Sequence, residues 1–115
     1  MYYVYILSNN AKTVLYTGVT NNLTRRITEH YLKRGNEKTF CGRYLCYNLV
    51  YYEEYKNVDT AIAREKEIKK WRKEKKIDLI RSENKDFVFL NETLFDCWPP
   101  VLNANEGHPP GSSRA

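Results

Sequence analysis

Cysteine and proline are scarce in this chain, and both are unevenly placed. The 115 residues include three cysteines, Cys41, Cys46 and Cys97, an odd number without a C-x-x-C pair. A disulfide framework or a zinc site is therefore not expected. We expect the thiols to be reduced, as in a cytosolic protein. All four prolines follow residue 98, so proline interrupts no element before that point.

Long apolar runs are also missing. No stretch approaches the roughly 20 apolar residues that a transmembrane helix needs. The first eight residues, MYYVYILS, have no basic region before their apolar run, and that run is too short for a secretory signal. The sequence thus predicts a soluble, cytoplasmic protein without a membrane partner.

One domain and a tail are expected from the composition. With 42% hydrophobic and 29% charged residues, the chain has an ordinary globular balance and the length for one modest core. We assign that domain to residues 1–96. Residues 97–115 hold the prolines together with glycine and serine, so they are expected to form a flexible tail, which Trp98 could anchor at its start.

Positive charge is in excess and concentrated in one segment. The net charge is +5, and residues 64–76 alone carry eight basic and three acidic side chains. Such a segment would attract the phosphates of a nucleic acid without reading its sequence. The side chains expected to contact phosphates are Lys69, Lys70, Lys73 and Lys76. A solvated helix face, or a surface for an acidic protein, is the alternative.

Residue patterns predict an α/β domain. Residues 2–7 and 14–20 are rich in β-formers and flank a polar turn at 8–12, which indicates a hairpin, and 45–55 are predicted to form a third strand. Helical patterns cover residues near 22–34, 58–72 and 75–83, while 36–44 are expected to be a loop. The predicted fold is a three-stranded antiparallel sheet flanked by three helices.

Two tyrosines are expected on one face of this hairpin. Because strand side chains alternate between faces, Tyr5 shares a face with Tyr3, and Tyr16 shares a face with Gly18. A glycine within a strand indicates a bulge or the close approach of another group. In a chain with ten tyrosines, ordinary packed aromatic side chains are the alternative.

Three polar residues fall at or within the apolar stripes of the predicted helices. Arg26 and His30 are four apart and point the same way, whereas the competing Arg25 points about 100° away. Glu65 falls inside the apolar arc of its helix, where a carboxylate is costly unless it is paired or bound to a cation. Alternatively, Glu65 lies at the rim of the core and pairs with a lysine. Likewise, Arg26 would be a solvated cation and His30 a packed side chain.

The order and spacing of these segments resemble the GIY-YIG nuclease superfamily over residues 1–92. Tyr3-Val4-Tyr5 matches the first family motif, and Tyr16-Thr17-Gly18 matches the second. Residues 18–30 are similar to the segment that carries the family's arginine and histidine. Residues 49–55 and 63–71 resemble the third strand and acidic helix of the small stand-alone bacterial members. Tyr3 replaces the glycine of the first motif, but both phenol positions are kept.

This resemblance implies a metal-dependent endonuclease acting on DNA, and leaves open a structure-specific role in repair or recombination. Glu65 would hold one divalent cation, Mg²⁺ or alternatively Mn²⁺, and Arg26 would stabilise the charge of the transition state. Tyr5 or Tyr16 would position or deprotonate the attacking water, with help from nearby cations because free tyrosine has a pKa near 10. His30 would orient a group or relay a proton. All five side chains, Glu65 included, are expected to line one concave surface.

The resemblance leaves some functions open. Asn84 falls where the family often has an asparagine after its last helix, and it is expected to contact the nucleic acid. A binding module of the same fold that grips nucleic acid without cutting it remains an alternative. So does a protein-interaction module that uses the basic helix. A protein partner for targeting, of unknown identity, would also suit so small a domain.

Overall fold

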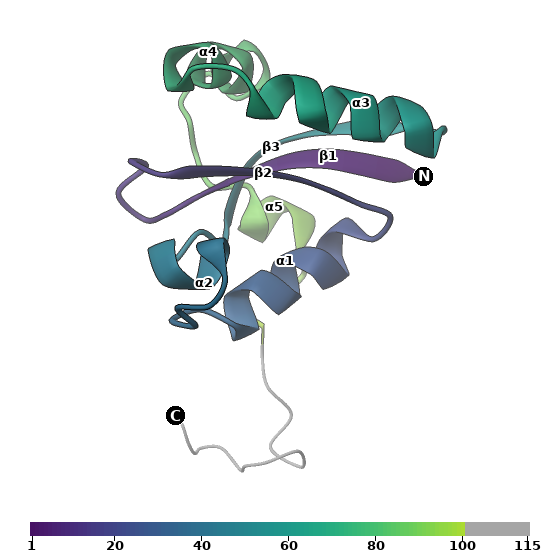
Figure 1. The fold of residues 1–115 in the computed structure, drawn as a ribbon. Coiled ribbons are helices and arrows are strands. Elements are labelled where there is room, and N and C mark those ends of the chain that lie inside the picture. Colours follow the sequence, from purple (N-terminus) through teal and green to yellow (C-terminus); the bar gives the residue numbers. More distant parts are fainter. Residues whose placement is uncertain (101–115) are drawn as a thin grey trace, which may run out of the picture.

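The computed structural model describes residues 1–100, which form three layers (Figure 1). The middle layer is a sheet of β1 (Tyr2–Ser8), β2 (Leu15–Thr20) and β3 (Asn48–Tyr55) in the order β2-β1-β3, with antiparallel neighbours. The predicted three-stranded antiparallel sheet is therefore confirmed. Residues 101–115, which make up most of the predicted tail, lie outside the described residues.

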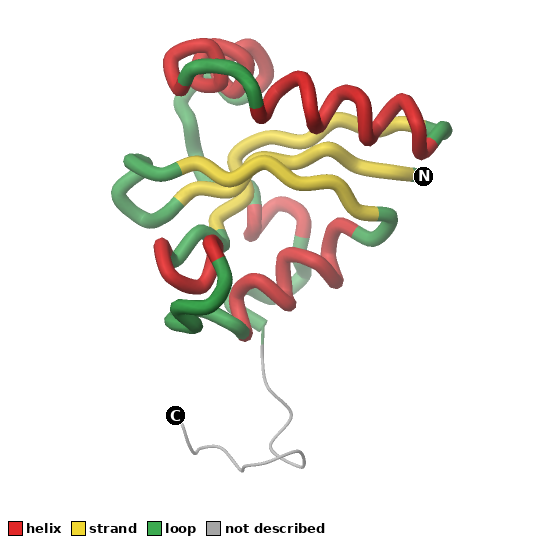
Figure 2. Tube along the Cα trace, in the orientation of Figure 1, coloured by secondary structure: helices red, strands yellow, loops and turns green. Residues whose placement is uncertain are grey.

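Helices cover both faces of the sheet. On one face lie α3 (Val58–Lys69) and α4 (Lys73–Glu83), and on the other lie α1 (Leu23–Leu32), α2 (Phe40–Tyr44) and α5 (Asn91–Leu94). Figure 2 distinguishes these helices from the loops that join them to the strands. None of the helices in residues 1–100 combines the length and apolar character needed to cross a bilayer.

Asn9 closes the hairpin between β1 and β2. Its Oδ1 accepts hydrogen bonds from the backbone N–H groups of Thr13, at 2.8 Å, and Val14, at 3.1 Å. A short polar side chain of this kind replaces backbone partners in a turn. The resulting register places Tyr5 opposite Gly18, and Leu7 opposite Tyr16.

The central strand β1 contributes to two hydrophobic cores, because its side chains alternate between the two faces. Val4 and Ile6 are fully buried beneath α3 and α4, while Tyr5 and Leu7 are buried beneath α1. Burying such a side chain contributes about 1.5–3 kcal/mol. The same strand therefore fixes α1 and α3 on opposite faces.

One segment expected to be a loop contains a helix. Within residues 36–44, α2 begins after Thr39, whose Oγ1 accepts a hydrogen bond from the backbone N–H of Gly42 at 3.0 Å. A five-residue helix is too short to show an apolar period. For the same reason the sequence did not predict the four-residue α5, so the described residues contain five helices and not three.

The third strand is shorter than predicted. It begins at Asn48 and not at residue 45, because Leu45 adopts the left-handed conformation (φ 57°) that ends α2. The N–H of Cys46 then donates to the carbonyl of Cys41 at 2.9 Å. Residues 45 and 46 therefore belong to the end of α2, although the side chains of residues 45–55 favour a strand.

The last described residues return to the domain. The Trp98 ring lies with its centroid 5.1 Å from that of Tyr31 and 4.8 Å from that of Phe95. Trp98 is thus placed on the α1 face, as anticipated for the side chain that could anchor the tail. The division of the chain after residue 96 stays a prediction.

Candidate active site

The side chain of Tyr5 occupies the space that Gly18 leaves open. A Cβ atom at position 18 would lie 2.5 Å from Tyr5 Oη and 2.6 Å from Tyr5 Cζ. Only glycine avoids this collision, since Tyr5 is 1% exposed and its Oη lies 3.0 Å from His30 Nε2. The glycine of the second motif therefore makes room for the tyrosine of the first.

Tyr5 and His30 form a contact between two uncharged groups at neutral pH. Burial, followed by the proximity of Tyr16, raises the pKa of Tyr5 above its ordinary value. Burial, followed by the positive charge of Arg26, lowers the pKa of His30 to about 4. The pair can hold or pass a proton through its hydrogen bond, but it brings no charge into the core.

Tyr16 lies against this pair and nearer to the solvent. Its ring centroid is 6.2 Å from that of Tyr5 and 5.4 Å from that of His30, and its side chain is only half-buried. Of the two predicted phenols, Tyr16 is therefore the one that an incoming molecule can reach.

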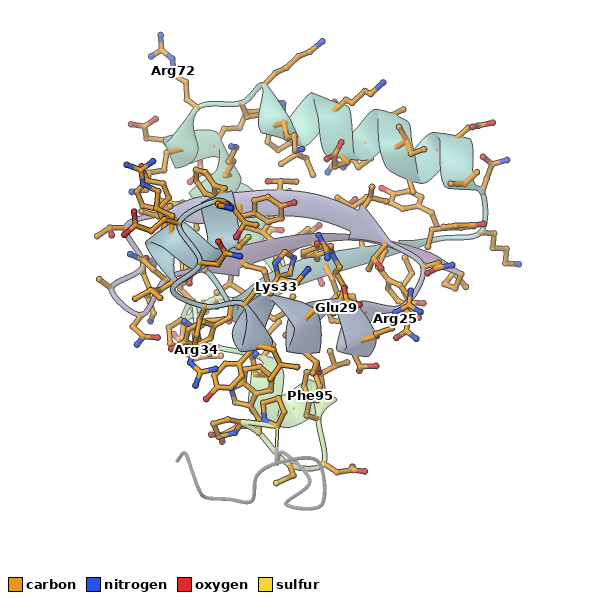
Figure 3. The ribbon with its side chains drawn as sticks, turned by 60° about the horizontal axis from the view of Figure 1, so that its bottom comes forward. Arg25, Glu29, Lys33, Arg34, Arg72 and Phe95 are labelled. Carbon is orange, nitrogen blue, oxygen red and sulfur yellow. The ribbon has the colours of Figure 1, made fainter. Side chains whose placement is uncertain are left out.

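Arg26 is held at the edge of this cluster by Glu29. Its Nη1 donates to Glu29 Oε1 at 3.0 Å, and 37% of the arginine side chain remains exposed. The competing Arg25 is 64% exposed and approaches Glu29 only to 3.9 Å. Figure 3 shows Arg25, Glu29 and Lys33 along α1. A guanidinium has five N–H groups, so Arg26 keeps donors for a phosphate.

Glu65 does not share the face that carries the phenols. It lies on α3, which covers the opposite face of the sheet from α1 (Figure 1), and one lysine links it to Tyr16 on the edge strand β2. Lys69 makes this link, with Nζ 2.7 Å from Glu65 Oε2 and 5.9 Å from the Tyr16 ring centroid. The expectation of one common face is thus corrected: the four residues on the α1 face are Tyr5, Tyr16, Arg26 and His30.

The pairing of Glu65 with a lysine was one of the alternatives left open by the sequence. Glu65 is 9% exposed, and the hydrogen bond from Lys69 satisfies its carboxylate. That hydrogen bond also raises the pKa of Lys69. Glu65 is thus paired with a lysine, and the same lysine also lies beside Tyr16 of the predicted site. The lysine partner and the site position are therefore compatible.

Arg64, the residue before Glu65, fixes α3 against the sheet. Its Nε and Nη2 donate to the two oxygens of Glu53 at 3.0 and 2.9 Å, and the phenols of Tyr51 and Tyr55 donate to the same carboxylate. This bidentate contact restricts rotation of α3 and so sets the direction of Glu65. This network was not predicted from the sequence, although Glu53 lies between Tyr51 and Tyr55 on the same face of β3.

The four lysines expected to contact phosphates have different surroundings. Lys69 is paired with Glu65, and Lys73 donates to a carbonyl of the β1–β2 loop. Lys76 is half-buried, and burial together with the charge of Lys69 lowers its pKa. Lys70 is exposed at the end of α3. The segment thus places positive charge next to β2, although its contact with phosphates stays a prediction.

The side-chain amide of Asn84 is hydrogen-bonded to backbone groups. Its Nδ2 donates to the carbonyls of Val50, at 2.9 Å, and Val88, at 2.8 Å, while its Oδ1 accepts from the N–H of Val88. These bonds join the end of α4 to β3 and use most of the amide's capacity. They do not support the predicted contact with nucleic acid.

Glu65 is the only carboxylate among the predicted site residues. No group of three or more His, Cys, Asp or Glu side chains within residues 1–100 is placed to hold a metal ion. Mg²⁺ is usually held by one or two carboxylates together with waters and substrate phosphates. The Glu65 carboxylate already faces an ammonium group at 2.7 Å, so its position favours a cation and fits this kind of site.

Comparisons with known proteins agree with these features. A model of the GIY-YIG catalytic domain matches residues 1–78. A UPF0213 protein from Clostridium perfringens is 43% identical over 84 residues, which cover 73% of this chain and 87% of that protein. A UPF0213 protein from Natronomonas pharaonis is 40% identical over 82 residues, or 71% of this chain and 93% of that protein.

A solved structure is also similar. The solution NMR structure of a UPF0213 protein from Bacillus halodurans shares 32% identity and covers 73% of this chain and 87% of its own, with a TM-score of 0.46. The residues matched by the family model include both tyrosine motifs and Glu65. This chain therefore belongs to the GIY-YIG family, whose catalytic domain is of the nuclease type and generally uses divalent metal ions.

Proposed function

We propose that this protein is a metal-dependent endonuclease that hydrolyses phosphodiester bonds in DNA. The observation that supports this proposal best is the cluster of Tyr5, Tyr16 and His30 with the Glu65–Lys69 pair beside it. A protein that only binds DNA needs cations near the phosphates. It gains nothing from a carboxylate there, because like charges repel.

Tyr16 is assigned the role of positioning or deprotonating the attacking water. Its phenol is the accessible one, whereas Tyr5 is buried against His30 and burial raises its pKa. Tyr5 and His30 therefore act as positioning residues, which hold the Tyr16 ring through their contacts with it. This assignment separates the two phenols that the sequence left equivalent.

Arg26 and Lys69 are assigned the role of stabilising the negative charge of the phosphate. Arg26 keeps free N–H donors at the edge of the cluster, and Lys69 lies beside the Tyr16 ring from the other side. Fixed positive groups that face developing negative charge stabilise a transition state most effectively where water is excluded. Together they would hold a phosphate over Tyr16.

Glu65 would hold the divalent cation, for which Mg²⁺ is proposed and Mn²⁺ is the alternative. When bound, such a cation neutralises charge on the phosphate and favours departure of the leaving oxygen. Glu65 is directed by the contact of Arg64 with β3, so its carboxylate is positioned before substrate arrives. Preorganisation of this kind reduces the reorganisation that the reaction requires.

The test is a cleavage assay on linear, nicked, flapped and branched DNA with and without Mg²⁺. Glu65→Gln should abolish Mg²⁺-dependent cleavage while DNA binding is kept or improved, because a negative charge is removed. Glu67→Gln is the matched control, since Glu67 is two residues away and 56% of its side chain is exposed. Full activity of Glu65→Gln, or equal loss in both variants, would refute the assignment.

A further inference from the structure

Two aromatic side chains of α2 stand half-exposed beside Tyr16. Phe40 is 48% and Tyr44 is 43% exposed, while the buried residues of this helix are Cys41 and Gly42. Single exposed apolar residues are common on protein surfaces. The rings of these two are neighbours, however, and neither belongs to the buried core beneath α2, to which this helix contributes Cys41.

The rings of Tyr16, Phe40 and Tyr44 form a continuous series, called the aromatic series below. The centroids of Tyr16 and Phe40 are 6.0 Å apart with planes at 31°, and those of Phe40 and Tyr44 are 4.8 Å apart with planes at 48°. The series therefore begins at the accessible phenol of the candidate active site and ends in solvent.

Positive charges lie at both ends of the aromatic series. The Arg43 guanidinium is 5.7 Å from the Tyr44 ring centroid, and Lys69 Nζ is 5.9 Å from that of Tyr16. Flat aromatic surfaces interleaved with cations are the means by which proteins bind single-stranded nucleic acid, since bases stack on the rings and phosphates meet the cations.

We propose that the aromatic series binds unpaired bases of the DNA strand whose phosphate lies at Tyr16. Bases within a duplex are stacked on their neighbours and do not offer a free face, so an unpaired segment is required. The protein would then select DNA that is single-stranded next to the cleaved bond, as in a flap or a frayed end. This inference rests on the proposed function for the place of the phosphate, but stacking can be measured without cleavage.

The binding experiment uses a single-stranded oligonucleotide that contains 2-aminopurine, and the same sequence in a duplex, both in the presence of EDTA. Stacking on the series should quench the 2-aminopurine fluorescence in the single strand. Phe40→Ala and Tyr44→Ala should each weaken single-strand binding by about 5-fold to 100-fold, with duplex affinity nearly unchanged. Phe40→Leu, which keeps apolar volume without an aromatic face, should behave like Phe40→Ala.

Tyr52→Ala is the matched control, because Tyr52 is 36% exposed on β3 and makes no part of the aromatic series. It should leave single-strand affinity and quenching unchanged. Equal affinity for single strand and duplex, or an equal loss in the Tyr52 and Phe40 variants, would overturn the proposal. Normal affinity of Phe40→Leu would also overturn it, since stacking would then not be the source of binding.

A cleavage experiment separates this proposal from the proposed function. If the protein cuts DNA, the preference for flapped over continuous duplex should fall in Phe40→Ala and not in Tyr52→Ala. A uniform loss on all substrates would contradict selection by stacking. If no substrate is cut but single-strand binding depends on the two rings, the nuclease assignment fails and the aromatic series stands as a binding surface.

Discussion

Gly18→Ala tests the central packing relation of the site with one added methyl group. The new Cβ atom would lie 2.5 Å from Tyr5 Oη, 2.6 Å from Tyr5 Cζ and 3.0 Å from Tyr16 Cε2. Tyr5 has no room to move away, because it is fully buried between the sheet and α1. The ring must therefore shift within a packed core and release its contact with His30.

The expected destabilisation follows from three contributions. Overpacking a core costs about 1–3 kcal/mol, and loss of the Tyr5–His30 hydrogen bond adds about 0.5–1.5 kcal/mol. Alanine offsets about 0.5–1 kcal/mol, since glycine within a strand is itself unfavourable. We expect the free energy of unfolding to fall by about 2 kcal/mol, seen in urea titrations as a lower midpoint with an unchanged slope.

A double-mutant cycle with Tyr5→Leu identifies the cause. Leucine lacks the Oη and Cζ atoms that collide with the new methyl group, so Gly18→Ala should cost much less in its presence, with a coupling energy of about 1–2 kcal/mol. Gly35→Ala is the contrast, because Gly35 has φ 89° and no neighbour within 4 Å of its Cβ position. Its cost should be the same with and without Tyr5→Leu. Equal costs for Gly18→Ala in both backgrounds would refute the reasoning.

Three further predictions concern charge and the end of the domain. The pKa of His30 is lowered to about 4 in the folded protein. The free energy of unfolding should therefore fall by about 3 kcal/mol as the pH is lowered from 6.5 to 4, because the unfolded chain binds this proton more readily. Urea titrations at successive pH values should show this fall in the wild type and not in His30→Gln. Lys70→Gln combined with Lys73→Gln should flatten the dependence of log affinity on log salt by roughly 0.9 per lost contact, and an unchanged slope would exclude these lysines from the DNA interface. Trp98→Ala should lower Tm by about 4–8 °C, because its contacts with Tyr31 and Phe95 contribute about 1 kcal/mol; an unchanged Tm would contradict the packing of this ring.

Long elements could be predicted from the sequence because they repeat a period. The alternation in β1 and β2, and the stripe along α1, each involve enough residues to separate a strand from a helix. In contrast, α2 depends on a single capping contact, from Gly42 to Thr39, and on the left-handed conformation of Leu45. Such local features have no period, and the aromatic residues around them favoured a longer third strand.

The types of the site residues could be predicted, but the way they meet could not. The position of Glu65 within an apolar arc indicated a buried carboxylate, and Lys69 four residues later was a readable partner. Neither pattern specifies which strand lies at the edge of the sheet. Only because β2 is an edge strand can Lys69, on the helix that covers one face, lie beside Tyr16, whose ring packs on the other. Were β2 central, a neighbouring strand would separate them, and the same motif residues would form no common site.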